Sequence, residues 1–99
     1  MNFRIIKRKV LEDFWTIHND CQSSLTAWFH EAKNAKWQNP NDIKIEYPSA
    51  SILGNNRVVF NLKGNKYRLI IAIHYSSKII FIRFIGTHAE YDKIDALTI

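Results

Sequence analysis

RVVFNLKGNKYRLIIAIHYSSKIIFIRFIG, residues 57–86, is the stretch of the sequence that decides the fold. It divides into three runs rich in Val, Ile, Phe and Tyr, a composition typical of β-strands. Gly64-Asn65 suits the positive φ angles of a two-residue hairpin turn, and Ser76-Ser77 is a second turn with weaker chemistry. The stretch therefore predicts three consecutive antiparallel strands.

The two turns predict a register, and the register assigns side chains to faces. The first loop places Asn61 opposite Arg68, and the second places Arg83 opposite Ile70. Because side chains alternate along a strand, one face is wholly apolar and comprises Val58, Phe60, Leu62, Tyr67, Leu69 and Ile71. The other face carries Arg57, Val59, Asn61, Lys63, Lys66, Arg68, Ile70, Ala72 and Arg83. We expect Asn61, Arg68 and Arg83 near the middle of this second face.

The charge pattern of this region points to a phosphate-bearing partner. No Asp or Glu occurs between Glu46 and Glu90, whereas six basic residues do: Arg57, Lys63, Lys66, Arg68, Lys78 and Arg83. A basic face without acids suits nucleic acid. The alternative is that basic strand residues only keep a sheet soluble and protect its edges. Composition alone leaves both interpretations open.

Whole-chain composition predicts one small domain spanning residues 1–99. The chain is 46% hydrophobic and has a net charge of +5, so nucleic acid is the first partner to consider and a membrane is not expected. The single Cys21 excludes an internal disulfide and fits a reducing compartment. Nothing at the N-terminus resembles a signal peptide. We expect a cytoplasmic protein.

The residues before the strands predict one further strand and a helical hairpin. Residues 3–6 are short and apolar, and we expect them to add to the sheet. Residues 9–19 and 25–36 have apolar side chains at helical spacing, so two helices should cover the apolar face of the sheet. Pro40 is expected to end the second helix, and residues 43–50 are expected to form a connector.

Two shorter segments complete the predicted fold. Ile52 and Leu53 are expected to lie under the sheet. Thr87 followed by Glu90 is a capping-box pattern, which predicts a short C-terminal helix that brings His88 and Tyr91 onto one side. The predicted class is α+β: an N-terminal strand, a helical hairpin, a three-stranded meander in a sheet of about four strands, and a terminal helix.

Metal and cofactor chemistry find little support in the sequence. The four histidines are isolated, and no C-x-x-C or His pair at i, i+4 spacing is present. There is no glycine-rich phosphate loop. We therefore expect no metal site and no cofactor.

Metal-independent cleavage of RNA needs only a few groups of the kind this chain carries. A base removes the proton of a ribose 2′-OH, cations stabilise the charge on phosphorus, and an acid protonates the leaving 5′-oxygen. His88 can act as acid or base near neutral pH, Tyr91 can donate a proton, and Arg68 can bind phosphate in a bidentate manner. The plain alternative is that His88 only caps the terminal helix and Tyr91 only anchors it.

The runs NRVVFNLKGNKYRLIIAIHY and IRFIGTHAEYDKIDA, with EAKNAKWQNPNDIK in the first half, resemble the HigB family of type II toxin–antitoxin toxins. The combination FN-x-KGN-x-YR and THAEYDK is specific. The resemblance implies a RelE-like endonuclease that cuts mRNA, usually on the translating ribosome. It also implies a HigA-like antitoxin with a helix-turn-helix, and contact with DNA only through the antitoxin complex.

Carried over by position, the resemblance implies two groups of site residues. The catalytic candidates are His88, Tyr91, Arg68 and Lys63. The candidates for RNA binding are Arg57, Asn61, Lys66 and Arg83. Members of the family differ in the residue that serves as base, so a Lys or Tyr can take that role instead of His88.

Two other functions remain open from the sequence. The chain can be a non-catalytic RNA- or ribosome-binding module that blocks translation. It can also be an interaction protein whose basic face binds only an acidic partner. Cleavage of transcripts distinguishes an endonuclease from a non-catalytic module that blocks translation. Absence of RNA affinity at low salt would favour the interaction protein.

Overall fold

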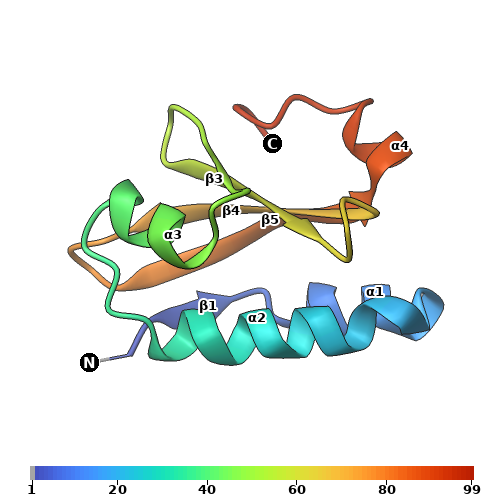
Figure 1. The fold of residues 1–99 in the computed structure, drawn as a ribbon, viewed down its shortest axis with the longest axis horizontal. Helices are drawn as coiled ribbons and strands as arrows, with labels where there is room; N and C mark the ends of the chain where they lie inside the picture. Colours follow the sequence, from blue (N-terminus) through green and yellow to red (C-terminus); the bar gives the residue numbers. More distant parts are fainter. Residues whose placement is uncertain (1) are drawn as a thin grey trace.

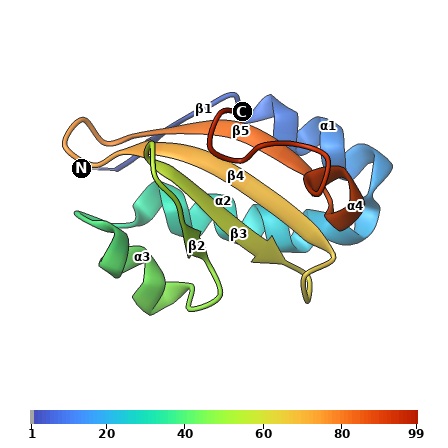
Figure 2. The ribbon, with the colours of Figure 1, turned by 90° about the horizontal axis from the view of Figure 1, so that it is seen from above.

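The computed structural model describes residues 2–99 and shows a five-stranded sheet in the order β1-β5-β4-β3-β2 (Figures 1 and 2). β1 runs parallel to β5, and the other neighbouring pairs are antiparallel. The elements are β1 (Arg4–Ile6), α1 (Lys9–Ile17), a 3-10 turn (Asn19–Cys21), α2 (Gln22–Asn34), α3 (Pro40–Glu46), β2 (Ser51–Ile52), β3 (Arg57–Leu62), β4 (Tyr67–His74), β5 (Ile79–Thr87) and α4 (His88–Tyr91). The predicted α+β class, N-terminal strand, meander and terminal helix are confirmed.

β2 is a fifth strand that the sequence did not predict. Ser51 pairs with Val59 and Ile52 with Val58, so this segment extends the edge of the sheet instead of lying under it. Ile52 remains 36% exposed, and Leu53 packs on the side of the sheet opposite the helices. Two residues are too short to show an alternating pattern, which explains why the expected sheet had about four strands.

The segment around Pro40 begins a helix, whereas the sequence-based prediction was a helix end followed by a connector. The Asn39 side chain accepts a hydrogen bond from the backbone N–H of Asp42 (3.1 Å), and Pro40 occupies the first turn. Proline is well suited to that position, because its missing N–H has no partner there anyway. α3 therefore covers residues predicted as a connector, and α2 ends earlier, at Asn34.

The helical face of the sheet forms the main core, as the strand alternation predicts. α1 and α2 lie along this face, with α3 beside β2 (Figures 1 and 2). The six residues assigned to the apolar face are at most 6% exposed. Trp28 and Trp37 are also buried, with ring centroids 5.5 and 6.4 Å from that of Phe60. Burial of such side chains contributes on the order of 2 kcal/mol each.

The opposite face is partly covered by residues 92–99, which we call the C-terminal strap. Figure 1 shows the strap and α4 on the side of the sheet opposite α1 and α2. Ala96 is 9% exposed and belongs to a small cluster with Val59 and Ile70, against which Ile94 and Ile99 pack. The sequence predicted a basic face here, with Asn61, Arg68 and Arg83 near its middle. The prediction was wrong for the middle of the face, which is apolar and covered.

The predicted register is correct for the first hairpin and partly correct for the second. Asn61 faces Arg68 as expected. The β4–β5 ladder follows the prediction from His74↔Ile79 to Ile71↔Ile82, and then a bulge makes Phe84, not Arg83, the partner of Ile70. Arg83 is the extra residue, and because it is flanked by apolar residues on both sides, the sequence pattern does not mark the bulge. Among residues 2–99, no helix has the length and apolar character needed to cross a membrane.

Candidate nucleic-acid interface

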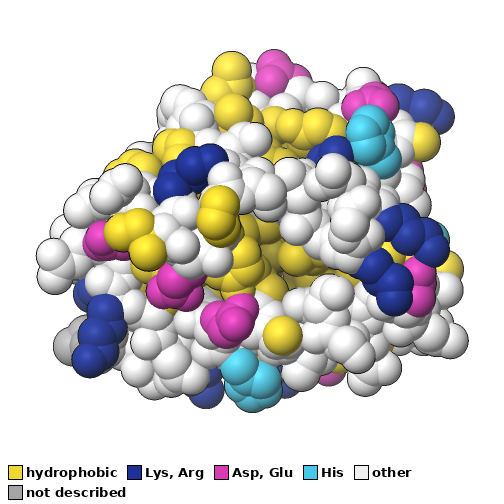
Figure 3. Space-filling model, viewed as in Figure 1, with side chains coloured by type: hydrophobic (Ala, Val, Ile, Leu, Met, Phe, Trp, Pro, Cys, Tyr) yellow, Lys and Arg dark blue, Asp and Glu magenta, His cyan; other side chains and the backbone are white. Residues whose placement is uncertain are grey.

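One corner of the sheet brings together the start of β4, the end of β5, the turn at residues 63–66 and the start of α4. Arg68 pairs with Gly86 across the β4–β5 ladder, and the backbone N–H of His88 donates to the carbonyl oxygen of Lys66 (3.2 Å). Figure 3 shows a histidine and Lys or Arg side chains gathered around α4, beside a strip of hydrophobic surface. We call this region the cationic corner and define it as Lys63, Lys66, Arg68, His88 and Tyr91.

The strand-to-helix junction fixes the direction of α4. The predicted capping box is present: Thr87 Oγ1 accepts from the Glu90 N–H (3.2 Å), and Glu90 Oε1 accepts from the Thr87 N–H (2.8 Å). The latter bond lowers the pKa of Glu90. A Cβ atom at Gly86 would lie 2.5 Å from the Phe84 ring and 3.1 Å from Glu90 Oε1. Only glycine allows this approach, so the junction holds His88 and Tyr91 in a defined place.

Arg68 is held against Tyr91. The centre of its guanidinium lies 5.6 Å from the centroid of the Tyr91 ring, which is within the range of a cation–π contact. Arg68 Nη1 also donates to the carbonyl oxygen of Asn65 (2.7 Å). Arg68 keeps further N–H donors, and a guanidinium held in this way can bind a phosphate with little loss of side-chain entropy.

His88 has a carboxylate partner that the sequence analysis missed. His88 Nδ1 and Asp92 Oδ2 are 3.0 Å apart, and both side chains are more than half exposed. When Nδ1 carries the proton and donates to Asp92, Nε2 keeps the lone pair that accepts a proton. The i, i+4 spacing of His88, at the start of α4, and Asp92, its C-cap residue, was the signal that could have found this pair.

The two lysines of the turn differ in their surroundings. Lys63 has a positive φ of 50° and is exposed. Lys66 Nζ lies 2.6 Å from Asp20 Oδ2, and the hydroxyl of Tyr67 donates to the other oxygen of the same carboxylate. The bonds from Lys66 and Tyr67 lower the pKa of Asp20 to about 2, and the bond to Asp20 raises the pKa of Lys66. Lys66 therefore also ties the sheet to the segment between α1 and α2.

The remaining predicted residues lie on the strap side of the sheet but outside the cationic corner. Asn61 is the cross-strand neighbour of Arg68, and its amide donates to the carbonyl oxygen of Ser49 (2.9 Å). Arg57 and Arg83 both donate to the main-chain oxygen of Ile99. The structure thus brings Arg68 against Tyr91 on the helix that also carries His88, and the backbone of the turn lies beside this helix, whereas the Lys66 side chain is bound to Asp20. Arg57 and Arg83 contact the last residue of the strap, and Arg83 remains exposed.

Acidic residues are closer to this interface than the sequence pattern suggested. The stretch between Glu46 and Glu90 lacks acids, but α4 and the strap bring Glu90, Asp92 and Asp95 to the same side, and Asp20 reaches Lys66. Glu90 is bonded to Thr87 and Asp92 to His88. Within residues 2–99, no group of three His, Cys, Asp or Glu side chains is arranged to hold a metal ion.

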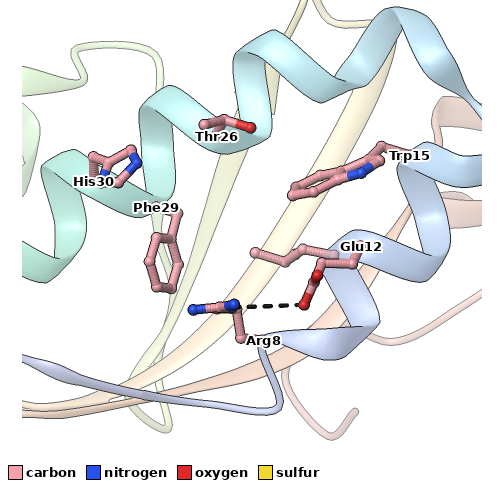
Figure 4. A pocket seen from close by; sticks show the side chains of 7 residues that line it. Arg8, Glu12, Trp15, Thr26, Phe29 and His30 are labelled. Carbon is pink, nitrogen blue, oxygen red and sulfur yellow. Dashed lines mark ion pairs between the residues drawn. The ribbon is translucent and has the colours of Figure 1, made fainter.

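A separate groove of about 320 Å³ lies between α1 and α2, on the helical side of the sheet. Figure 4 shows Trp15 from α1 and Phe29 from α2 beside it, with Arg8 paired to Glu12 below them. The Arg8 guanidinium lies 5.1 Å from the Phe29 ring centroid. Arg68 and Tyr91 lie on the other side of the sheet, so this groove is not part of the cationic corner.

The α+β fold with a five-stranded sheet is consistent with the RelE-like class of toxins. Residues 21–94 match the HigB toxin family, described as the RelE-like toxic component of a toxin–antitoxin system. The match covers most of the sequence, so the chain belongs to the HigB toxin family. This confirms the family predicted from the FN-x-KGN-x-YR and THAEYDK patterns. A toxin of this kind has an antitoxin as its partner.

Curated relatives extend the similarity to nearly the full length. The chain is 26% identical over 95 residues to the "mRNA interferase toxin HigB" of Escherichia coli K12. The aligned region covers 94% of this chain and 91% of that protein. The "mRNA interferase HigB" of Shigella flexneri matches to the same extent. A protein of the same name from E. coli O6:H1 is 27% identical over 73 residues, or 72% of this chain and 71% of that protein. The endoribonuclease class predicted from the sequence agrees with these names.

Proposed function

We propose that this toxin is an mRNA endonuclease that works without a metal ion at the cationic corner. The observation that carries the proposal is the juxtaposition of four groups. The Arg68 guanidinium lies over the Tyr91 ring, His88 is on the same short helix as Tyr91, and the Asp92 carboxylate contacts His88 Nδ1. The relatives named mRNA interferase support RNA as the substrate. The proposed place of action is the cytoplasm, where mRNA is translated.

The proposed reaction is an in-line transfer within one RNA strand. His88 Nε2 takes the proton of a ribose 2′-OH, whose oxygen forms a bond to the adjacent phosphorus while the bond to the 5′-oxygen breaks. Tyr91 donates a proton to that leaving oxygen. Arg68 and Lys63 stabilise the added negative charge on the phosphoryl oxygens, and Asp92 positions the imidazole of His88.

The proposal has a direct chemical test. Purified protein is treated with EDTA and then incubated with mRNA on translating ribosomes, in buffer that contains only the Mg²⁺ that the ribosomes need. In a parallel assay, the protein is incubated with RNA alone in EDTA. We expect cleavage fragments that end in 2′,3′-cyclic phosphate. Fragments with 5′-phosphate ends would contradict 2′-OH attack. If primer extension shows only uncut transcripts while translation is blocked, the translation-blocking alternative is favoured.

Dependence on the ribosome is part of the proposal. The corner offers few acid–base groups, and holding reacting atoms in line is worth several orders of magnitude in rate. We therefore expect cleavage on translating ribosomes to exceed cleavage of the same RNA alone. Equal rates in the two assays would contradict ribosome dependence while leaving the endonuclease intact.

The antitoxin that family membership implies is proposed to be HigA-like, with a helix-turn-helix through which the pair contacts DNA. We expect an adjacent reading frame for such a protein, whose co-expression restores growth and which co-purifies with the toxin. A neutralising partner without a DNA-binding helix would contradict this part of the proposal.

A further inference from the structure

Two arginines on the strap side have a role that the proposed cleavage step does not use. Arg57 Nη2 donates to the main-chain oxygen of Ile99 at 2.8 Å, and Arg83 Nε donates to the same oxygen at 3.1 Å. The two guanidinium groups come from β3 and β5, on either side of β4. Guanidinium N–H groups that converge on one oxygen reproduce the way arginines hold a phosphate.

The arginine pair is built into the sheet. Arg57 Nη1 donates to the carbonyl oxygen of Asn55 (3.1 Å), which fixes the orientation of the guanidinium. Arg57 Nε is buried and has no hydrogen-bond partner among the described residues. Arg83 is the extra residue of the β-bulge, and the bulge directs its side chain toward the strap. The pair is therefore oriented toward one point by the backbone around it.

This point is distinct from the cationic corner. Arg57 pairs with Ala72, four residues along β4 from Arg68. At the rise of a strand, four residues correspond to about 13 Å. An RNA strand that crosses this side of the sheet can therefore place one phosphate at Arg68 and another at Arg57 and Arg83.

The strap that fills this point is held by three side-chain hydrogen bonds and by the apolar packing of Ile94, Ala96 and Ile99 on the small cluster of Val59 and Ile70. Besides the two arginine bonds, Asn55 Nδ2 donates to the carbonyl oxygen of Leu97 (2.9 Å). Leu97 is 44% exposed, and Ala96 is the strap residue in the buried cluster. The backbone N–H groups of Leu97 and Ile99 bond to Asp95, within the strap itself. The strap can therefore leave the sheet without breaking a strand pairing.

We propose that Arg57 and Arg83 form a phosphate-binding site for RNA and that the strap occupies this site until RNA displaces it. The inference rests on the proposed function only in taking RNA as the ligand. A competing segment of the same chain lowers apparent affinity by the fraction of molecules in which the site is open. Loosening the strap therefore increases affinity for RNA, whereas removing the arginines decreases it.

The test compares two neighbouring asparagines that share a backbone conformation. Asn55 and Asn56 both have φ of 60°, so glycine fits either position without strain. Asn55→Gly removes the side-chain bond to the strap, and Asn56→Gly is the matched control.

The probe is a single-stranded RNA whose riboses carry 2′-O-methyl groups, so that it cannot be cleaved by 2′-OH attack. We expect Asn55→Gly to bind this RNA about fivefold more tightly than wild type, as the loss of one hydrogen bond to the strap implies. Asn56→Gly should bind as wild type does.

A second pair of substitutions tests the arginines themselves. With Arg57→Gln and Arg83→Gln together, RNA binding should weaken at least tenfold, and Asn55→Gly should no longer increase it. Amide hydrogen exchange at Leu97 and Ile99 should become faster when the RNA binds to the wild-type protein.

Three results would overturn the inference. In the first, the Asn55→Gly protein is less stable but binds RNA no more tightly than wild type. In the second, RNA binds but amide hydrogen exchange in the strap does not change. In the third, no variant binds RNA. Because the modified RNA is not cleaved, these outcomes are independent of the nuclease assay. If ordinary RNA is cleaved but the strap is unaffected by RNA, the proposed nuclease stands and the proposed phosphate site is wrong. If RNA releases the strap but ordinary RNA is not cleaved, the phosphate site stands and the proposed nuclease is wrong.

Discussion

The two faces of the sheet are covered in different ways. On the helical face, α1, α2 and α3 enclose a continuous core that includes Trp28, Phe60 and Leu69. On the strap face, a one-turn helix and the strap cover a small cluster around Val59 and Ile70 and leave cationic side chains around it. The first face contains the main core, whereas the second has a much smaller buried cluster, and this contrast underlies the proposed exchange of the strap for RNA.

The largest expected effect is in catalysis, and it compares the two ends of the strap face. We expect His88→Ala to reduce mRNA cleavage by about 10²–10⁴-fold, because it removes the proposed base. His74→Ala is the matched control, since His74 is an exposed strand residue outside the cationic corner. Cleavage rates on translating ribosomes measure both. Full activity of His88→Ala together with loss of activity in His74→Ala would move the site to the other end of β4.

The next difference is in stability, and two leucines test it. Leu69 is fully buried under the helices, and Leu53 is half-buried against the strap-side cluster. We expect Leu69→Ala to lower the free energy of unfolding by about 2–5 kcal/mol, and Leu53→Ala by about 1 kcal/mol. Urea denaturation of the two variants measures the contrast. Equal losses would mean that both faces contribute equally to stability.

Two glycines compare the strand-to-helix junction with the loop before β3. A Cβ at Gly86 would lie 2.5 Å from the Phe84 ring, whereas a Cβ at Gly54 would meet only Leu97 Cδ2, at 3.9 Å. We expect Gly86→Ala to cost about 1–3 kcal/mol of stability and to lower cleavage, because it displaces α4. Gly54→Ala should change neither. Thermal unfolding and cleavage rates check the pair, and a harmless Gly86→Ala would show that α4 tolerates displacement.

The smallest expected effect depends on pH. The pKa of Asp20 is lowered from 3.8 to about 2 by its bonds to Lys66 and Tyr67. The pair therefore stabilises the fold fully above about pH 4, and this contribution disappears as the pH falls toward about 2. Asp20→Asn should destabilise the protein at neutral pH and differ little from wild type near pH 2, as measured by urea midpoints.

The control for this last effect is Lys66→Gln, which removes the first cause of the lowered pKa of Asp20. In the Lys66→Gln background, we expect the Asp20→Asn substitution to produce a smaller pH-dependent change in stability than it does in the wild-type protein. A change of the same size in both backgrounds would assign the lowered pKa to Tyr67 alone.

The helical face was predictable because strand alternation and turn chemistry act over short distances. Gly64 and Asn65 both adopt positive φ, and the first hairpin follows the predicted register throughout. The capping box at Thr87 also formed as predicted. In each case a few neighbouring residues contain the whole physical reason for the structure.

The strap face was less predictable because its determinants are distant in sequence or ambiguous. The bulge at Arg83 lies in a run where every neighbour is apolar, so no pattern marks it. The helical face had one error of the same kind: proline can follow a helix or begin one, and here the cap from Asn39 makes Pro40 the start of α3. The placement of the strap required contacts between Ile99 and residues of β3 and β5. Of the site, the grouping of Arg68, His88 and Tyr91 was predictable, and the partner Asp92 was missed.

The parallel pairing of β1 with β5 has a consequence for how the molecule is made. Arg4 in β1 pairs with Ile79 in β5, so β1 is synthesised long before the strand with which it pairs. Pairings so far apart in sequence close slowly, and β1 cannot take its place in the sheet before β5 has been synthesised. The junction that positions His88 and Tyr91 follows β5 directly, so we expect the cationic corner to assemble late in folding.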